Sequence, residues 1–167
     1  MPDSFDILED FDDSGLQLAI RTATPDDREW IRRVLIHRWH GTRIVTRGVV
    51  HAADELPALI AEAGGEQIGL ATYRCTPPEC ELVTLDGMLP ARGVGAALLE
   101  RVADAARASG CTRLSVVTTN DNLAALRFYQ KRGFALAALY PNAVTRSRQI
   151  KPVIPLTGND GIPIRDE

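Results

Sequence analysis

The chain has 167 residues, of which 45% are hydrophobic and 25% are charged, and this composition predicts one soluble globular domain with a continuous core. Lys and Arg total 19 against 22 Asp and Glu, so the net charge of −3 provides no positive field for a nucleic-acid backbone. No apolar run is long enough to cross a bilayer, and the acidic N-terminus is unlike a secretory signal. We therefore expect a cytoplasmic protein that binds neither nucleic acid nor membrane and keeps its cysteines reduced.

The domain is expected between two tails. Residues 1–14 are rich in Asp and Glu and predict an acidic flexible tail, the domain itself spans 15–157, and residues 158–167 form a C-terminal tail. Alternating apolar residues predict a first strand at 16–20. The Thr-Pro-Asp-Asp run at 24–27 then predicts the start of a helix, because acidic side chains favour its positive end.

The middle of the chain is predicted to be mostly strand. Residues 41–57 carry β-branched side chains but are interrupted by Gly and Pro, so no element is assigned there. Two apolar runs, 58–63 and 67–74, flank a tight Gly-Gly-Glu turn and predict a β-hairpin. The next strand, 80–85, leads into a glycine-rich loop at 90–95.

Helices and strands are expected to alternate after this loop. Apolar residues recur at three- and four-residue spacing up to Gly110, which predicts a helix with one buried stripe. The remaining predicted elements are a strand at 113–118, a helix from Asn122 to Gly133, and strands at 134–139 and 150–156. Two prolines would confine the last of these strands to a sheet edge.

The glycine-rich loop predicts an anion-binding site. A helix whose first turn is Gly93-Val94-Gly95-Ala96-Ala97 presents unpaired backbone N–H groups at the positive end of the peptide dipoles. These small residues let a phosphate approach the main chain, and Arg92 can add a charged contact. The alternative is that the glycines only allow a strand to turn into a packed helix.

Two other phosphate-binding motifs do not fit these residues. A dinucleotide fingerprint needs Gly or Ala where Leu98 stands, and an acidic residue near 118–120. A nucleoside-triphosphate loop needs Gly-Lys-Ser/Thr, but Gly95 is followed by two alanines. The sequence therefore disfavours a Rossmann oxidoreductase and a P-loop protein that binds nucleoside triphosphates.

Two motifs lie one predicted strand apart: Gly93-Val94-Gly95-Ala96-Ala97-Leu98-Leu99 and Asn122-Leu123-Ala124-Ala125-Leu126-Arg127-Phe128-Tyr129-Gln130-Lys131-Arg132-Gly133-Phe134. In them the chain resembles the GNAT superfamily of N-acetyltransferases. The family's coenzyme loop reads Arg/Gln-x-x-Gly-x-Gly/Ala before Ala-Leu-Leu, and its second element reads Asn-x-x-Ala-x-x-Phe-Tyr-x-Lys-x-Gly-Phe. In the register that keeps the helix intact Pro90 holds the leading position of the loop, whereas a shifted register places Arg92 there.

The resemblance implies both a fold and an activity. The fold would be one α/β (α+β) domain with a mixed, mainly antiparallel sheet of six to seven strands and about four flanking helices. Acetyl-CoA would enter where the strands of Glu81 and Arg113 splay apart, and its acetyl group would pass directly to a primary amine without a metal. The acceptor would be a small-molecule or peptide amine. The resemblance leaves the oligomeric state open and allows a homodimer through a late strand such as residues 150–156. A non-catalytic acyl-CoA-binding sensor or interaction module with the same fold is the alternative.

Roles for single residues also follow from the resemblance. Tyr129 would be the general acid at the sulfur, unless it only packs the core. Glu81 would be the base, unless it is a solvated charge at a strand end. Main-chain groups of Leu85 and Asp86 would bind the pantetheine arm and polarise the thioester carbonyl, and Asn122 would cap its helix, contact the coenzyme, or both. Candidates for the acceptor side are His37, Trp39, His40 and His51.

Overall fold

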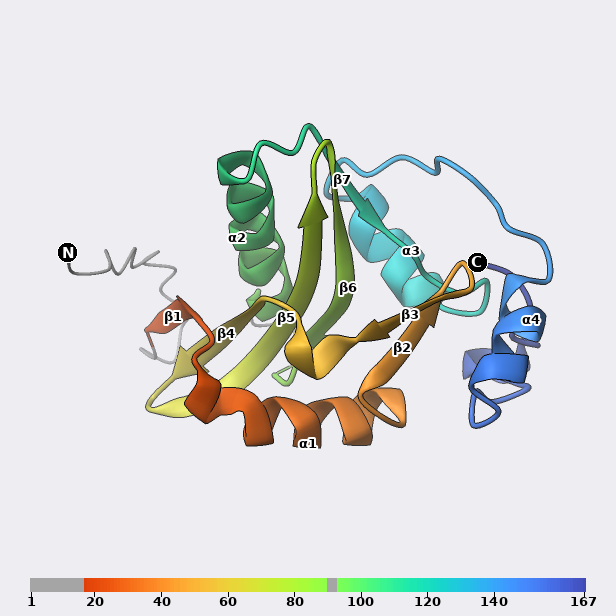
Figure 1. Ribbon diagram of the computed structural model, residues 1–167, viewed down its shortest axis with the longest axis horizontal. Coiled ribbons are helices and arrows are strands. Elements are labelled where there is room, and N and C mark those ends of the chain that lie inside the picture. Colours follow the sequence, from red (N-terminus) through yellow and green to blue (C-terminus); the bar gives the residue numbers. More distant parts are fainter. Residues whose placement is uncertain (1–16, 90–92) are drawn as a thin grey trace.

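The structure is a computed structural model that describes residues 17–89 and 93–167 (Figure 1). The predicted tail at 1–14, together with Pro90 and Arg92, lies outside the described residues. None of the described helices is long and apolar enough to cross a membrane.

One five-stranded sheet forms the centre of the fold. Its order is β1-β4-β5-β6-β7, and its neighbouring strands are antiparallel except for the parallel pair β6 and β7. The predicted mixed, mainly antiparallel α/β class is confirmed. The strands are β1 (Leu18–Thr22), β4 (Ala58–Ala63), β5 (Glu66–Thr76), β6 (Glu79–Gly87) and β7 (Arg113–Val116).

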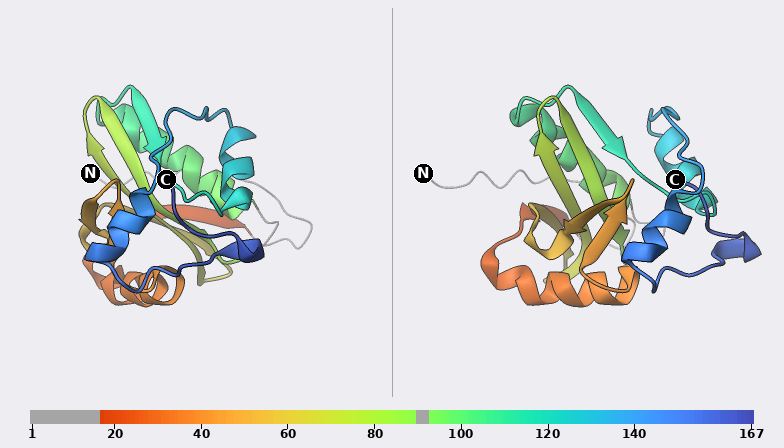
Figure 2. Two further views of the ribbon diagram at one scale, coloured as in Figure 1. Left: turned by 90° about the vertical axis from the view of Figure 1, so that its right-hand side faces the viewer. Right: turned by 45° about the vertical axis from the view of Figure 1, so that its right-hand side comes forward.

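Two helices cover opposite faces of this sheet, α1 (Arg28–Trp39) and α2 (Val94–Ala108), as Figures 1 and 2 show. Successive strand residues point to opposite faces, so each helix meets alternate side chains of the same strands. The α1 face buries Ile31, Val34 and Leu35 against Ile60, Leu70 and Val83, and the α2 face buries Val94, Leu98 and Val102 against Leu59, Ala71 and Leu82. Each Val, Leu or Ile among these side chains contributes about 1.5–3 kcal/mol on burial.

A second, two-stranded sheet occupies the region where no element was assigned. Strands β2 (Arg43–Thr46) and β3 (Val49–Ala52) form a hairpin whose turn residues, Arg47 and Gly48, have φ of 49° and 75°. A two-residue turn with positive φ at both central positions matches the twist of the two strands that it connects. The seven strands of the described residues are thus divided into sheets of five and two.

The last third of the chain departs from the prediction. Helix α3 (Leu123–Gln130) forms as expected, but residues 134–139 form no strand, and Leu136 and Leu139 remain exposed. That prediction was wrong because no neighbouring strand supplies hydrogen-bond partners to this segment. Short 3₁₀ helices complete the described elements at Pro25–Asp27, Ala53–Glu55 and Asn159–Gly161.

The strand predicted at residues 150–156 is also absent. Helix α4 (Ala143–Ile150) precedes this segment and buries Val144 and Ser147 on one face. The Arg148 guanidinium donates to the carbonyl oxygens of residues 154, 155 and 164, at 3.1, 2.5 and 2.6 Å. Arg148 thus ties residues 154 and 155 to α4, and the two prolines bring no N–H donor for a sheet.

Residues 158–167 are hydrogen-bonded to the rest of the domain. The backbone N–H of Tyr140 donates to the Glu167 carbonyl at 2.7 Å, and the Glu167 N–H returns a bond to Tyr140 at 3.3 Å. The Glu167 side chain accepts a hydrogen bond from the backbone N–H of Arg47 at 2.6 Å. This places Glu167 beside the turn between β2 and β3, as Figure 1 shows.

Candidate active site

Strands β6 and β7 separate part of the way along β6. Their pairing runs from Glu79 opposite Arg113 to Leu82 opposite Val116, whereas β6 continues to Gly87. The stretch that carries Leu85 and Asp86 therefore lies beyond the last β6–β7 pair, and its main-chain groups on that side are not used by β7.

A β-bulge in β6 lies at the same level. Tyr73 on β5 is opposite Leu82, but the preceding Thr72 is opposite Thr84, so Val83 is an extra residue on β6. A bulge leaves its extra residue outside the ladder and increases the local twist. The β6–β7 pairing thus ends at Leu82, where the bulge begins, and the two strands part over the half of β6 that leads to α2.

The first turn of α2 begins at Gly93, which adopts the left-handed φ of 70° and provides no side-chain cap. The Ala97 N–H donates to the Gly93 carbonyl at 3.0 Å, so the preceding amides lie in the turn where a helix has no internal acceptor. They lie at the positive end of a 15-residue helix. A Cβ at Gly95 would lie 3.5 Å from the Phe128 ring, an ordinary contact distance, so the first turn of α2 lies against α3 at this point.

Glu81 is buried beneath the β2–β3 hairpin, with 6% of its surface exposed. Its Oε1 accepts a hydrogen bond from the Thr46 hydroxyl at 2.8 Å, and its Oε2 lies 3.2 Å from Nη2 of Arg47. Glu81 is therefore a buried, partnered carboxylate and not a solvated charge at a strand end.

His51 joins this network through the Thr46 hydroxyl. Its Nε2 lies 2.8 Å from the Thr46 hydroxyl oxygen and 3.7 Å from Oε1 of Glu81. Burial lowers the pKa of His51, and the positive charges of Arg74 and Arg47 act in the same direction, against the opposing charge of Glu81. Burial thus favours the neutral form of the ring.

Tyr129 lies half-buried on α3, between two other rings. Its ring centroid is 5.1 Å from that of Phe128, in an edge-to-face arrangement, and 5.3 Å from that of Phe134. Burial raises the pKa of Tyr129 to about 12, and the negative charge of Asp86 adds to the rise. The phenol therefore keeps its proton throughout the physiological range.

The Asp86 side chain is a titratable group that the sequence reasoning did not single out. Its Oδ2 accepts a hydrogen bond from Nε1 of Trp39 at 2.8 Å. Burial raises the pKa of Asp86, although the Trp39 hydrogen bond and the charge of Arg38 oppose the rise. Its charge contributes to the raised pKa of Tyr129.

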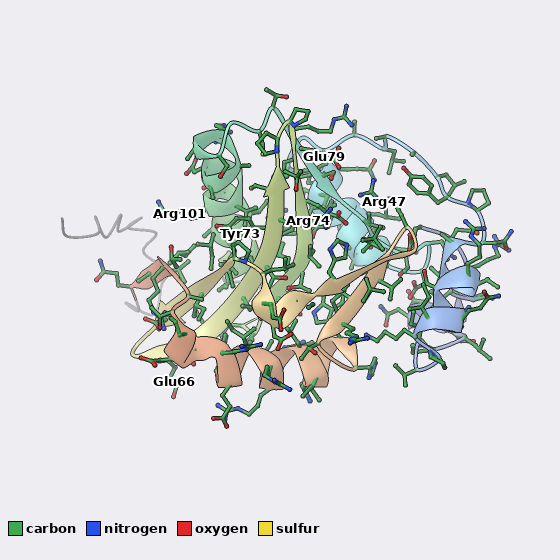
Figure 3. All side chains as sticks on the ribbon, in the orientation of Figure 1. Arg47, Glu66, Tyr73, Arg74, Glu79 and Arg101 are labelled. Atoms are coloured by element: carbon green, nitrogen blue, oxygen red, sulfur yellow. The ribbon has the colours of Figure 1, made fainter. Side chains whose placement is uncertain are left out.

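A cavity of about 690 Å³ opens beside Tyr129. It is bounded by β7, by α3 and by the segment that follows α3, and Arg47 and Glu167 also contribute to its wall. Figure 3 shows Arg47 at the tip of the β2–β3 hairpin, on the side of β7 and α3. Arg47 thus contacts Glu81 and lines the same cavity as Tyr129.

The other candidate residues are placed as follows. The predicted cap is confirmed, because Oδ1 of Asn122 accepts a hydrogen bond from the Ala125 N–H at 3.1 Å. His37 and His40 are exposed on and just after α1, whereas His51 is buried. Within the described residues, no group of three or more His, Cys, Asp or Glu is arranged to hold a metal ion.

Comparison with known proteins covers the same part of the chain. Residues 18–134 match the model of the acetyltransferase (GNAT) family. The uncharacterized protein YdhI of Bacillus subtilis (strain 168) is 42% identical over 130 residues, which cover 77% of this chain and 81% of YdhI. The match to the family model includes both Glu81 and Tyr129.

Solved structures show the same fold at lower identity. A GNAT family acetyltransferase from Elizabethkingia anophelis with acetyl-CoA bound superposes with a TM-score of 0.63 at 19% identity, covering 89% of this chain and 93% of that protein. The aminoglycoside N-acetyltransferase AAC(6')-Iy in complex with CoA gives a TM-score of 0.59 at 21% identity, covering 77% and 94%.

Proposed function

The chain belongs to the acetyltransferase (GNAT) family, and we propose that it transfers the acetyl group of acetyl-CoA directly to a primary amine of a small-molecule or peptide acceptor. This reaction needs a site for the coenzyme diphosphate, a base for the amine proton and a proton donor for the departing thiolate. The described residues contain a candidate for each.

The coenzyme would bind across the opening between β6 and β7. The N-terminal amides of α2 suit a diphosphate because they are directed donors at a positive helix end. The β6 stretch of Leu85 and Asp86 would hydrogen-bond the pantetheine arm with its main chain, and an amide there would polarise the thioester carbonyl. Two of the solved relatives carry acetyl-CoA or CoA, which supports this assignment.

Glu81 would accept the proton of the amine, directly or through a water molecule. The buried Glu81 carboxylate, held between Thr46 and Arg47, is the observation that carries the proposal. A buried carboxylate whose two oxygens are held by donors keeps one orientation, which suits a group that must meet the proton of a bound amine.

Tyr129 would act at the sulfur. As the amine nitrogen bonds to the acetyl carbon, the carbon–sulfur bond breaks and the electron pair moves to sulfur. The protonated phenol would donate a hydrogen bond or its proton to this sulfur, since its raised pKa keeps it neutral.

Isothermal titration with acetyl-CoA and a thiol-release assay with a panel of amines test the proposal. We expect coenzyme binding and turnover on at least one amine, and about a 10²- to 10⁴-fold lower kcat in Glu81→Gln and Tyr129→Phe. Glu79→Gln, two residues earlier on the same strand, is the matched control and should keep turnover, because the Glu79 carboxylate is bound to Ser115 and Arg113 instead. Coenzyme binding without turnover on any amine would reject the enzyme and favour an acyl-CoA sensor.

A further inference from the structure

We propose that Thr46 and His51 are positioning residues for Glu81, joined in a chain of hydrogen bonds that runs from His51 through Thr46 to the carboxylate. The proposal rests on the proposed function, in which Glu81 is the base. It adds two residues of the β2–β3 hairpin to the machinery of the reaction, and both would act through Glu81.

The direction of the chain follows from counting hydrogen atoms. The Thr46 hydroxyl has a single hydrogen, and an ionised carboxylate only accepts, so Thr46 donates to Oε1 of Glu81 at 2.8 Å. The hydroxyl oxygen must then accept from Nε2 of His51, which lies 2.8 Å away. The geometry therefore requires the His51 tautomer that carries its proton on Nε2.

The hairpin holds these groups rigidly. Ile44 is opposite His51 and Thr46 is opposite Val49, so Thr46 and His51 are diagonal neighbours on one face of the two strands. Thr46 and His51 are 7% and 3% exposed, which limits their freedom to choose other rotamers. One turn residue further, Arg47 contacts the second carboxylate oxygen, and its own backbone N–H is bonded to Glu167.

Holding both oxygens of Glu81 in this way restricts the carboxylate to one orientation. Catalytic groups that are held in place before the reaction need not be reoriented during it, and a displacement of about 1 Å can cost 100-fold in rate. The charged groups around His51 are Arg47 from the hairpin turn, Arg74 from β5 and Glu81 from β6. A neutral imidazole has one N–H, and at His51 the 2.8 Å contact with the Thr46 hydroxyl uses it.

Thr46→Val tests the chain through kinetics. Valine has nearly the shape of threonine but no donor, so we expect kcat to fall roughly 10- to 100-fold while the KM for acetyl-CoA stays within about twofold. Thr46→Ser keeps the hydroxyl and should restore most of kcat. Thr72→Val is the matched control, because it removes another buried hydroxyl of the sheet, which is bonded to Thr84 at 2.7 Å and not to Glu81. Melting curves of all three variants show whether each is folded.

The tautomer of His51 gives a readout that does not depend on turnover. The chain has three histidines, so side-chain ¹⁵N spectra of the full-length protein are simple to assign by substitution. We expect His51 in the Nε2–H form, and a change of its ¹⁵N shifts in Thr46→Val but not in Thr72→Val. An Nδ1–H tautomer overturns the proposal, as does a folded Thr46→Val with wild-type kcat when Glu81→Gln is inactive. If Glu81→Gln itself keeps full turnover, the proposed base is rejected, and with it the positioning role.

Discussion

Replacing Gly69 with alanine should push α2 away from the sheet. A Cβ at Gly69 would lie 2.6 Å from Cγ1 of Val94 and 2.9 Å from Cδ1 of Leu98. Ordinary carbon–carbon contacts are about 3.5–4.0 Å, so strand or helix must shift by roughly 1 Å. Val94 and Leu98 are 2% and 0% exposed, so neither side chain can move out into solvent. Overpacking of this kind costs about 1–3 kcal/mol, and the loss of a glycine returns about 0.4–1 kcal/mol through the unfolded chain.

The expected net loss is therefore roughly 0.5–2 kcal/mol in the free energy of unfolding, which lowers Tm by roughly 1–8 °C at this chain length. Urea unfolding followed by circular dichroism measures the free energy of unfolding, and calorimetry measures Tm. Coenzyme affinity should weaken as well, because Val94 lies in the first turn of α2. Gly87→Ala is the control for stability, since a Cβ there would meet its nearest atom, the backbone nitrogen of Gly95, at an ordinary 3.5 Å. If Gly69→Ala were as stable as wild type and bound CoA equally well, this account of the packing would be wrong.

Three further predictions concern the ion pair of Arg21 and Asp27, the Asp86 carboxylate and the Lys151 ammonium. The Arg21 guanidinium donates hydrogen bonds to Asp27 at 2.7 and 2.8 Å, and these bonds lower the pKa of Asp27 below its ordinary 3.8. The ion pair therefore stabilises the fold fully above pH 3.8, and this stabilisation is lost as the pH falls toward the lowered pKa of the folded state. The free energy of unfolding should accordingly decline below about pH 5, and Asp27→Asn should flatten that decline and cost about 1–3 kcal/mol near neutral pH. Asp86→Asn should lower the pKa of Tyr129 from about 12 but leave it above 10.0, since burial is the larger cause, as an ultraviolet tyrosinate titration against Tyr129→Phe would show. The Lys151 ammonium donates to the carbonyls of Trp39 and Arg43 at 2.7 and 2.8 Å, and Lys151→Met removes it. Amide hydrogen exchange should then become faster in α4 and at the end of α1. Unchanged exchange would mean that these hydrogen bonds do not hold α4 to α1.

The sequence predicted those parts of the site that depend on neighbours in the chain. The strand of Glu81, the glycine turn and α2 follow from apolar spacing and glycine positions, and Asn122 caps α3 as expected. The helix that carries Tyr129 was predicted for the same reason. Caps and periodicities involve residues a few positions apart, and a sequence displays these directly.

Contacts between distant segments were not predictable in this way. The β2–β3 hairpin turns at Arg-Gly rather than at the more usual Asn-Gly, so its signal was weak. Alternating and apolar residues at 134–139 and 150–156 favoured strands, but no neighbouring strand completes them in the fold. A strand requires a hydrogen-bonding partner, and the sequence of one segment does not contain it.

The sequence by itself determined the order of most elements, the position of Glu81 on a strand and the position of Tyr129 on a helix. Only the tertiary structure decided that Glu81 is buried, because its partners Thr46 and Arg47 are 35 and 34 residues away in the chain. The same holds for Asp86, which meets Trp39 across 47 residues. Local hydrogen bonds and apolar periodicity set the elements, whereas the surroundings of a carboxylate depend on which distant strand folds over it.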